Sequence, residues 1–127
     1  AGTVKGVINQ RLVRRVCPHC KVAYKSKEYS EEKAFFGIPD FLELKLYKGT
    51  GCDKCKNTGY KGRVAIHELF LMNDELRKMI VDGASESEIR SRAVEIGMTT
   101  MKQDGFDKAL EGLTTLEEVR RFVLVTE

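Results

Sequence analysis

Four cysteines constrain this chain more than any other feature of its sequence, because they fall as two pairs of the same form. Cys17 and Cys20 lie in "RRVCPHCK", and Cys52 and Cys55 lie in "GCDKCKNTGYKGR", which gives the spacing C-x2-C-x31-C-x2-C. A two-residue gap lets one tight turn present both thiolates to one ion, and two such turns complete the tetrahedron that zinc prefers. The sequence therefore predicts a four-cysteine metal site, with Zn²⁺ as the expected ion.

Other uses of paired cysteines stay open: a disulfide framework, a redox centre and an iron centre. The sequence shows no signal peptide and no apolar run of the roughly 18 residues that a membrane span needs, so we expect a cytosolic chain, where thiols stay reduced. A thioredoxin-like centre would place one pair at the N-terminus of a helix. Four thiolates leave no open coordination position, so a zinc held by them would be structural. We expect His19, inside the first pair, to be a surface residue.

Charge is unevenly distributed along the 127 residues, although the net charge of the chain is only +3. Residues 1–63 carry 14 Lys and Arg against 6 Asp and Glu, whereas residues 64–127 carry 8 against 13. This division predicts two structural parts. The basic half is either a solvated surface or a face that meets an acidic ligand or a neighbouring subunit.

Hydrophobic periodicity predicts the elements of the first half. Val4, Val7, Ile8, Leu12 and Val16 recur at helical spacing, which predicts a helix over 3–16. A short helix over 30–36 is expected to begin at the cap residue Ser30 and to stop at Gly37 and Pro39. Alternating and β-branched residues predict strands over 42–48 and 63–71, with the second cysteine pair in the connection between them.

The second half is predicted to be a small helical bundle. Asn73 or Asp74 can open a helix over 74–82, and Gly97 and Gly112 can end two later helices. Three pairs match capping boxes: Ser85 with Glu88, Thr100 with Gln103, and Thr115 with Glu118. The residues expected to point inward are Leu76, Ile80, Ile89, Ala93, Met101, Phe106, Leu110, Leu116, Val119 and Phe122.

The order of three motifs resembles the C-terminal segment of the ATPases of type II secretion and type IV pilus assembly. The motifs are "QRLVRRVCPHCK" at 10–21, "GCDKCKNTGYKGRVAIHELF" at 51–70 and "GLTTLEEVRR" at 112–121. The resemblance implies an α+β fragment, in which a tetracysteine zinc-binding subdomain of short strands and loops precedes a small helical bundle. It divides the chain into a helix leaving a RecA-like ATPase core (1–16), the zinc-binding subdomain (17–62) and a strand with the helical C-terminal subdomain (63–127).

The resemblance also implies a setting: a homohexamer in the bacterial cytoplasm, peripheral to the inner membrane. The partners it implies are the ATPase core, neighbouring subunits and an inner-membrane platform or recruiting protein of the machine, with no nucleic acid. ATP and Mg²⁺ would bind only the full-length parent, because this chain lacks the G-x-x-x-x-G-K-[ST] loop that cradles phosphates. We therefore expect no catalytic residue and no ATP hydrolysis by this chain alone, and its parent to be the secretion or pilus motor.

Two arginines can be carried over from the family motifs. Arg11 belongs to the Gln-Arg-Leu motif and Arg63 to the Gly-Tyr-x-Gly-Arg motif, and either can reach a phosphate or carboxylate bidentately. They are candidates for nucleotide or subunit contact, against the simpler interpretation that Arg63 pairs with Glu68 or faces solvent. His67 beside Glu68 is weak evidence of acid–base chemistry.

Three rival functions remain open. A nucleic-acid-binding zinc ribbon would suit the basic half, although 31 residues between the pairs is long for a ribbon. An Hsp40-type zinc chaperone module fits only the second pair loosely, because Asn57 stands where its motif has a glycine. A thiol oxidoreductase is the third.

Overall fold

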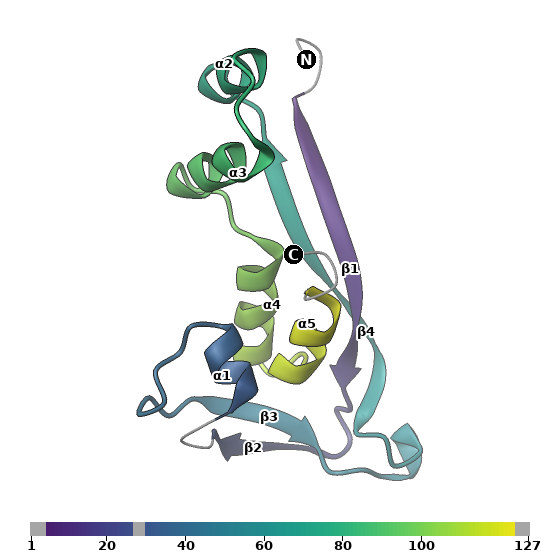
Figure 1. The fold of residues 1–127 in the computed structure, drawn as a ribbon. Helices are drawn as coiled ribbons and strands as arrows, with labels where there is room; N and C mark the ends of the chain where they lie inside the picture. Colours follow the sequence, from purple (N-terminus) through teal and green to yellow (C-terminus); the bar gives the residue numbers. More distant parts are fainter. Residues whose placement is uncertain (1–4, 27–29, 124–127) are drawn as a thin grey trace.

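A long antiparallel ribbon forms the axis of the molecule (Figure 1). The computed structural model describes residues 5–26 and 30–123. Strand β1 (Gly6–Val16) pairs with β4 (Tyr60–Leu71) from Gly6 opposite Leu71 to Arg14 opposite Arg63, and the register shifts between Arg14 and Val16. The helix predicted over 3–16 is therefore wrong for the described residues, and Val4 lies outside them.

The apolar residues of β1 explain this error. In the ribbon Val13 and Val16 are buried, whereas Val7, Ile8 and Leu12 are 46%, 68% and 48% exposed. Apolar side chains thus occur on both faces of the strand, and their combined spacing imitates a helical stripe. A β-branched segment pairs readily with another β-rich segment, and the long-range partner in β4 decides the outcome.

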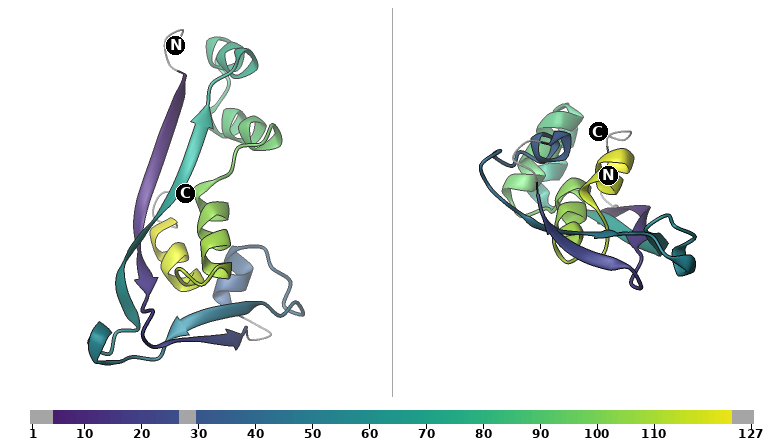
Figure 2. Two further views of the ribbon diagram at one scale, coloured as in Figure 1. Left: turned by 180° about the vertical axis from the view of Figure 1, so that it is seen from behind. Right: turned by 90° about the horizontal axis from the view of Figure 1, so that it is seen from below.

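A second, shorter antiparallel sheet lies across the end of the ribbon. Strand β2 (Lys21–Lys25) pairs with β3 (Lys45–Gly49), from Lys21 opposite Gly49 to Lys25 opposite Lys45. Figures 1 and 2 show this β2–β3 sheet beneath the helices, with the connection from β3 to β4 projecting at one side. The strands predicted over 42–48 and 63–71 are confirmed with shifted ends.

The helices begin where their cap residues predict. Helix α1 (Glu31–Phe35) starts at Ser30, whose hydroxyl accepts the N–H of Lys33 at 3.0 Å. The other four are α2 (Asp74–Val81), α3 (Glu86–Glu95), α4 (Met101–Leu110) and α5 (Leu116–Val123). Gly97 and Gly112 have φ of +114° and +85°, as the predicted helix ends require. The mixture of two strand pairs and helices confirms the α+β class.

The core lies where α4 and α5 pack on the ribbon and on the β2–β3 sheet. One cluster joins Val13 and Ile66 of the ribbon to α4 and α5, and another joins Leu46 of β3 to Ala109 and Leu116. Two residues predicted to point inward do not, because Ile80 is 40% and Leu110 38% exposed. The other predicted inward residues are buried or half-buried: Leu76, Ile89, Ala93, Met101, Phe106, Leu116, Val119 and Phe122.

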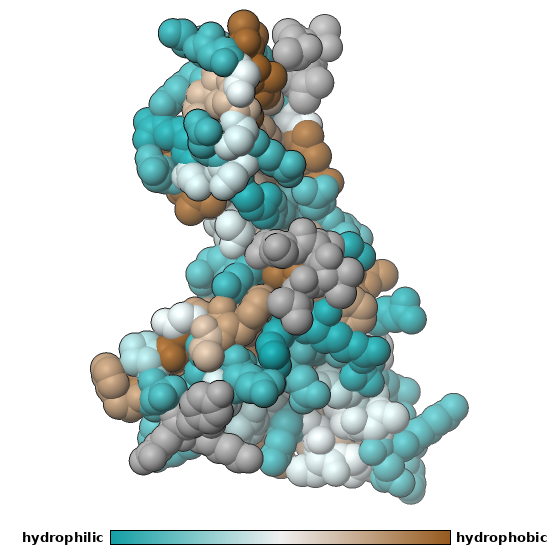
Figure 3. All heavy atoms as spheres, viewed as in Figure 1, coloured by the Kyte–Doolittle hydropathy of each residue, from teal (hydrophilic) through white to brown (hydrophobic). Residues whose placement is uncertain are grey.

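Helices α2 and α3 stand apart from this core, at the far end of the ribbon. Figure 3 shows the surface narrowing between them and the lower body. Ile80 lies on α2, where fewer elements are near enough to cover a helix face. Within residues 5–26 and 30–123, no helix has the length and apolar content needed to cross a bilayer.

Candidate metal centre

The fold brings the two cysteine pairs together at the junction of the ribbon and the β2–β3 sheet. Cys17 directly follows β1, and Cys20 precedes β2. The second pair lies between β3 and β4, where Cys52 leads into a single 3₁₀ turn, η1 (Asp53–Cys55). Cys17 and Cys55 are buried, and Cys20 and Cys52 are half-buried.

The four sulfur atoms lie close enough together to surround one ion. The Sγ–Sγ distance is 3.8 Å for Cys17–Cys52, 3.8 Å for Cys20–Cys55 and 3.7 Å for Cys52–Cys55, and all four atoms lie within 4.8 Å of one another. Zn–S bonds of about 2.3 Å give a tetrahedral edge of about 3.8 Å, so the donor set and its spacing fit such an ion. The four cysteines are free thiols, and His19 lies exposed outside the cluster.

Backbone N–H groups point at two of the sulfurs. Gly51 donates to Cys20 Sγ, and both Cys52 and Gly59 donate to Cys55 Sγ, each at 3.3 Å. Burial acts to raise the pKa of Cys55, but the N–H groups of Gly59 and Cys52, with side-chain bonds from Cys52 and Cys20, lower it to about 6. Burial raises the pKa of Cys20 to about 11. The Cys55 thiol is thus prepared as a metal ligand, whereas the Cys20 thiol must lose a proton to become one.

A set of contacts that the sequence did not reveal lies next to the cysteine pairs. We call it the clamp, and it consists of Arg14, Tyr60, Thr115 and Glu118. The buried carboxylate of Glu118 accepts the backbone N–H of Arg14 at 2.7 Å and its Nε and Nη2 groups at 3.1 Å. The Arg14 guanidinium lies 4.1 Å from the centre of the Tyr60 ring, and the Tyr60 hydroxyl bonds to Thr115 at 2.8 Å. Helix α5 is thereby fixed to both strands of the ribbon beside the cysteine pairs.

The clamp also corrects the predicted capping box at Thr115. Its hydroxyl accepts the N–H of Glu118 at 3.1 Å, as a cap residue should. The side chain of Glu118 binds Arg14, however, in place of the return bond to the cap. The available signal was Glu118 within "GLTTLEEVRR", but nothing local identifies a partner 104 residues away.

The two carried-over arginines lie on the ribbon, and neither belongs to the cysteine cluster. Arg11 is paired with Ile66 and Arg63 with Arg14 in the strand register, and both side chains are exposed. Arg11 also lines a pocket of about 340 Å³. Their roles in nucleotide or subunit contact stay predictions.

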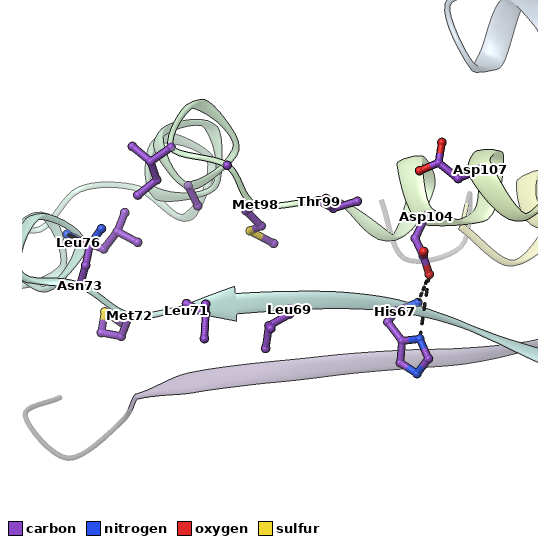
Figure 4. Close-up of a pocket in the computed structure, with 13 residues that line it drawn as sticks. His67, Leu69, Leu71, Met72, Asn73, Leu76, Met98, Thr99, Asp104 and Asp107 are labelled. Atoms are coloured by element: carbon purple, nitrogen blue, oxygen red, sulfur yellow. Dashed lines mark hydrogen bonds and ion pairs between the residues drawn. The ribbon is translucent and has the colours of Figure 1, made fainter.

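His67 and Glu68, which the sequence offers only as weak acid–base candidates, make hydrogen bonds that join β4 to the helices. The Glu68 carboxylate is 4% exposed and accepts Arg90 at 2.6 Å and the N–H of Met101 at 3.0 Å. His67 lines a groove of about 650 Å³, where its backbone N–H donates to Asp104 at 2.8 Å (Figure 4). Asp104 is further bound by Lys108 at 2.8 Å. Arg90 rather than Arg63 thus forms the ion pair with Glu68.

Comparisons with known proteins agree over nearly the whole chain. A family model described as "Type II/IV secretion system protein" matches residues 1–121. The chain is 51% identical to the type IV pilus assembly ATPase PilB of Thermus thermophilus over 90% of its own length and 13% of that protein. It is 39% identical to the type II secretion system ATPase E of Vibrio cholerae, over 95% of the chain and 24% of the relative. It is 38% identical to the type IV pilus assembly ATPase PilB of Myxococcus xanthus, over 89% of the chain and 20% of that relative. The chain therefore spans a quarter or less of the length of these relatives.

Proposed function

The chain belongs to the type II/IV secretion system protein family, and from that membership we propose that it is the C-terminal, zinc-containing portion of a motor ATPase. The parent powers type II secretion or type IV pilus assembly as a homohexamer in the bacterial cytoplasm, at the inner membrane. Within it this portion has a structural and docking role. The names of the relatives support the machine, and the cysteine cluster supports the metal.

The observation that carries the proposal is the convergence of four thiol groups within 4.8 Å of one another. Cys17, Cys20, Cys52 and Cys55 would hold the ion, and four thiolates leave it no open position for water or substrate. Zinc held in this way contributes on the order of 10 kcal/mol to folding in small metal-binding domains. The ion therefore braces the end of the ribbon beside β2, all five residues of which are exposed.

ATP hydrolysis belongs to the rest of the parent. No glycine in the 127 residues is followed by lysine, so the Gly-Lys step of a phosphate-binding loop is missing. The purified chain, incubated with Mg-ATP, is expected to release no phosphate above the rate in buffer. Turnover that copurifies with the chain and is lost on its depletion would contradict this part of the proposal.

Docking is tested with the full-length parent and the cytoplasmic part of its inner-membrane platform protein. A Cys52→Ser variant should lose the metal and retain little of the platform protein in a pull-down. The matched control is Lys78→Ser in α2, at the opposite end of the ribbon, which should bind as the wild type does. If metal-free Cys52→Ser binds the platform protein as fully as the wild type, the docking role is contradicted.

Separate assays distinguish the alternative functions. A nucleic-acid-binding ribbon would bind oligonucleotides with strong salt dependence, which we do not expect of this chain. A thiol oxidoreductase would reduce insulin disulfides in its metal-free form, and a chaperone module would suppress aggregation of unfolded protein. None of these activities requires the platform protein.

A further inference from the structure

Two glycines meet beside the cysteine cluster without being ligands themselves. Gly49 ends β3, and Gly59 immediately precedes β4. A methyl group placed on Gly49 would lie 2.6 Å from the Cα of Gly59 and 2.7 Å from its carbonyl carbon. A methyl group on Gly59 would lie 2.6 Å from the carbonyl oxygen of Gly49. A side chain at either position would therefore overlap the backbone of the other glycine.

Gly59 links the two cysteine pairs directly. Its N–H donates to Cys55 Sγ at 3.3 Å, and its carbonyl oxygen accepts the N–H of Cys17 at 2.9 Å. One peptide segment thus bonds to a residue of each pair. Gly59 is buried and has a φ of +81°, so it needs both the space and the conformation of glycine.

Gly49 leads the chain to the remaining thiols. The residue after it, Thr50, donates its N–H to the carbonyl oxygen of Cys20 at 3.2 Å, and Gly51 donates to Cys20 Sγ at 3.3 Å. The φ of Gly49 is not positive, so a residue with a side chain could adopt its backbone conformation. Space is the property that Gly49 must provide.

We propose that Gly49 and Gly59 are positioning residues of the metal centre. Their backbone contact is the point where the segment that wraps Cys20 crosses the segment that binds Cys17 and Cys55. This contact holds the first and second pairs at the distance at which four sulfurs form one tetrahedron. A side chain at either glycine pushes the pairs apart and weakens metal binding while leaving every ligand in place. The inference rests on the metal centre of the proposed function, but not on docking.

The test uses Co²⁺, whose visible spectrum reports tetrahedral thiolate coordination, on the reduced chain. Gly49→Ala is expected to bind Co²⁺ roughly 10- to 100-fold more weakly than the wild type, because an inserted methyl group forces the backbone to shift. Its Co²⁺ bands should also move or lose intensity. The helical signal in circular dichroism should stay near that of the wild type, since α4 and α5 pack on Val13, Ile66 and Leu46, which are not part of the glycine contact.

Two matched controls separate crowding from the general effect of replacing a glycine. Gly37→Ala replaces a glycine of φ +72° with nothing within 4 Å of the new methyl group. Gly62→Ala, at φ +79°, lies three residues from Gly59, but its methyl group would come no closer than 3.6 Å to the side chain of Arg15. Both should keep the Co²⁺ spectrum of the wild type.

Each outcome decides a separate point. If Gly49→Ala binds Co²⁺ with the affinity and spectrum of the wild type, the positioning role is overturned. If Gly62→Ala perturbs the spectrum as much as Gly49→Ala, the contact has no special role. If Gly49→Ala gains neither helical signal nor Co²⁺ bands, even when refolded in excess Co²⁺, the effect is not confined to the site and the inference fails. Absence of tetrahedral thiolate bands in the wild type would instead refute the metal centre itself.

Discussion

Glu118 shows how one buried side chain can join distant parts of this chain. Its carboxylate is 1% exposed and receives three N–H groups from Arg14, while Tyr60 covers the guanidinium of Arg14. The pKa of Arg14 is raised, chiefly by its hydrogen bonds to Glu118. Because the side chain of Arg14 remains 45% exposed, water screens part of this attraction. Most of the stabilisation comes from the hydrogen bonds to the buried carboxylate, which would be costly to leave without partners.

A Glu118→Gln substitution tests this contact. The amide can replace only part of the carboxylate's hydrogen bonding, so the free energy of unfolding should fall by about 1–3 kcal/mol. Chemical denaturation of the metal-loaded chain, followed by circular dichroism, measures the change. Glu117→Gln is the matched control, since Glu117 is exposed and its loss should cost less than about 0.5 kcal/mol. Equal effects of the two substitutions would contradict the clamp.

The thiol groups of Cys20 and Cys55 differ in proton affinity, and metal binding should show it. With pKa values of about 11 and about 6, Cys20 carries a proton at neutral pH, whereas Cys55 is largely a thiolate. A metal must displace the proton of Cys20, so falling pH opposes binding and rising pH favours it. The apparent affinity for Zn²⁺ should increase at least about tenfold per pH unit between about pH 6 and pH 8. Competition with a chromophoric chelator measures this slope, and an affinity independent of pH would refute it.

At the scale of elements, the parts that local chemistry decides could be predicted and the parts that distant pairing decides could not. The caps at Ser30, Ser85 and Thr100 lie where the sequence indicates, because a cap bonds within three residues of itself. The grouping of the four cysteines was equally predictable, since each pair needs only a two-residue turn. Strand β1 was mistaken for a helix because its apolar residues lie on both faces and its partner, β4, lies some 50 residues away.

The contact of α5 with β4 gives a prediction at this scale. Thr115 caps α5 and also bonds to the hydroxyl of Tyr60, whereas Thr100 caps α4 through the N–H of Gln103. Thr100→Ala should lower the free energy of unfolding by about 1 kcal/mol, the usual cost of a lost cap. Thr115→Ala should cost about 1 kcal/mol more, because it also removes a partly buried hydrogen bond.

Thermal or chemical denaturation of the two variants, each in the wild-type and Tyr60→Phe backgrounds, completes the comparison. The extra cost of Thr115→Ala should disappear once Tyr60 has lost its hydroxyl. The cost of Thr100→Ala should be the same in both backgrounds. An unchanged cost of Thr115→Ala in Tyr60→Phe would show that the bond does not stabilise the chain.

At the scale of the whole molecule, the cysteine cluster lies where two sheets of different direction meet. The β1–β4 ribbon carries α2 and α3 at one end and the β2–β3 sheet at the other (Figures 1 and 2). The division in charge between residues 1–63 and 64–127 does not follow this geometry, because β1 belongs to the basic half and pairs with β4 of the acidic half. The two parts that the charges predicted are thus joined by the ribbon.

Removing the metal should loosen the end of the molecule that holds the cysteines and spare the helices. A strong chelator should make trypsin cut faster after three exposed lysines around the second pair, Lys54, Lys56 and Lys61. Cleavage after Lys78 in α2 serves as an internal control and should keep its rate. Added Zn²⁺ should restore the original pattern. If the chelator leaves the cleavage rate unchanged at all four lysines, the metal does not stabilise this end.

The most direct measurement is X-ray absorption at the zinc edge, combined with metal analysis, on the reduced chain purified in the presence of Zn²⁺. The account predicts one zinc per chain, with four sulfur neighbours at about 2.3 Å. A reduced, folded chain that binds no zinc, or a bound zinc with nitrogen or oxygen in place of sulfur, would contradict the claim that the four cysteines share one ion.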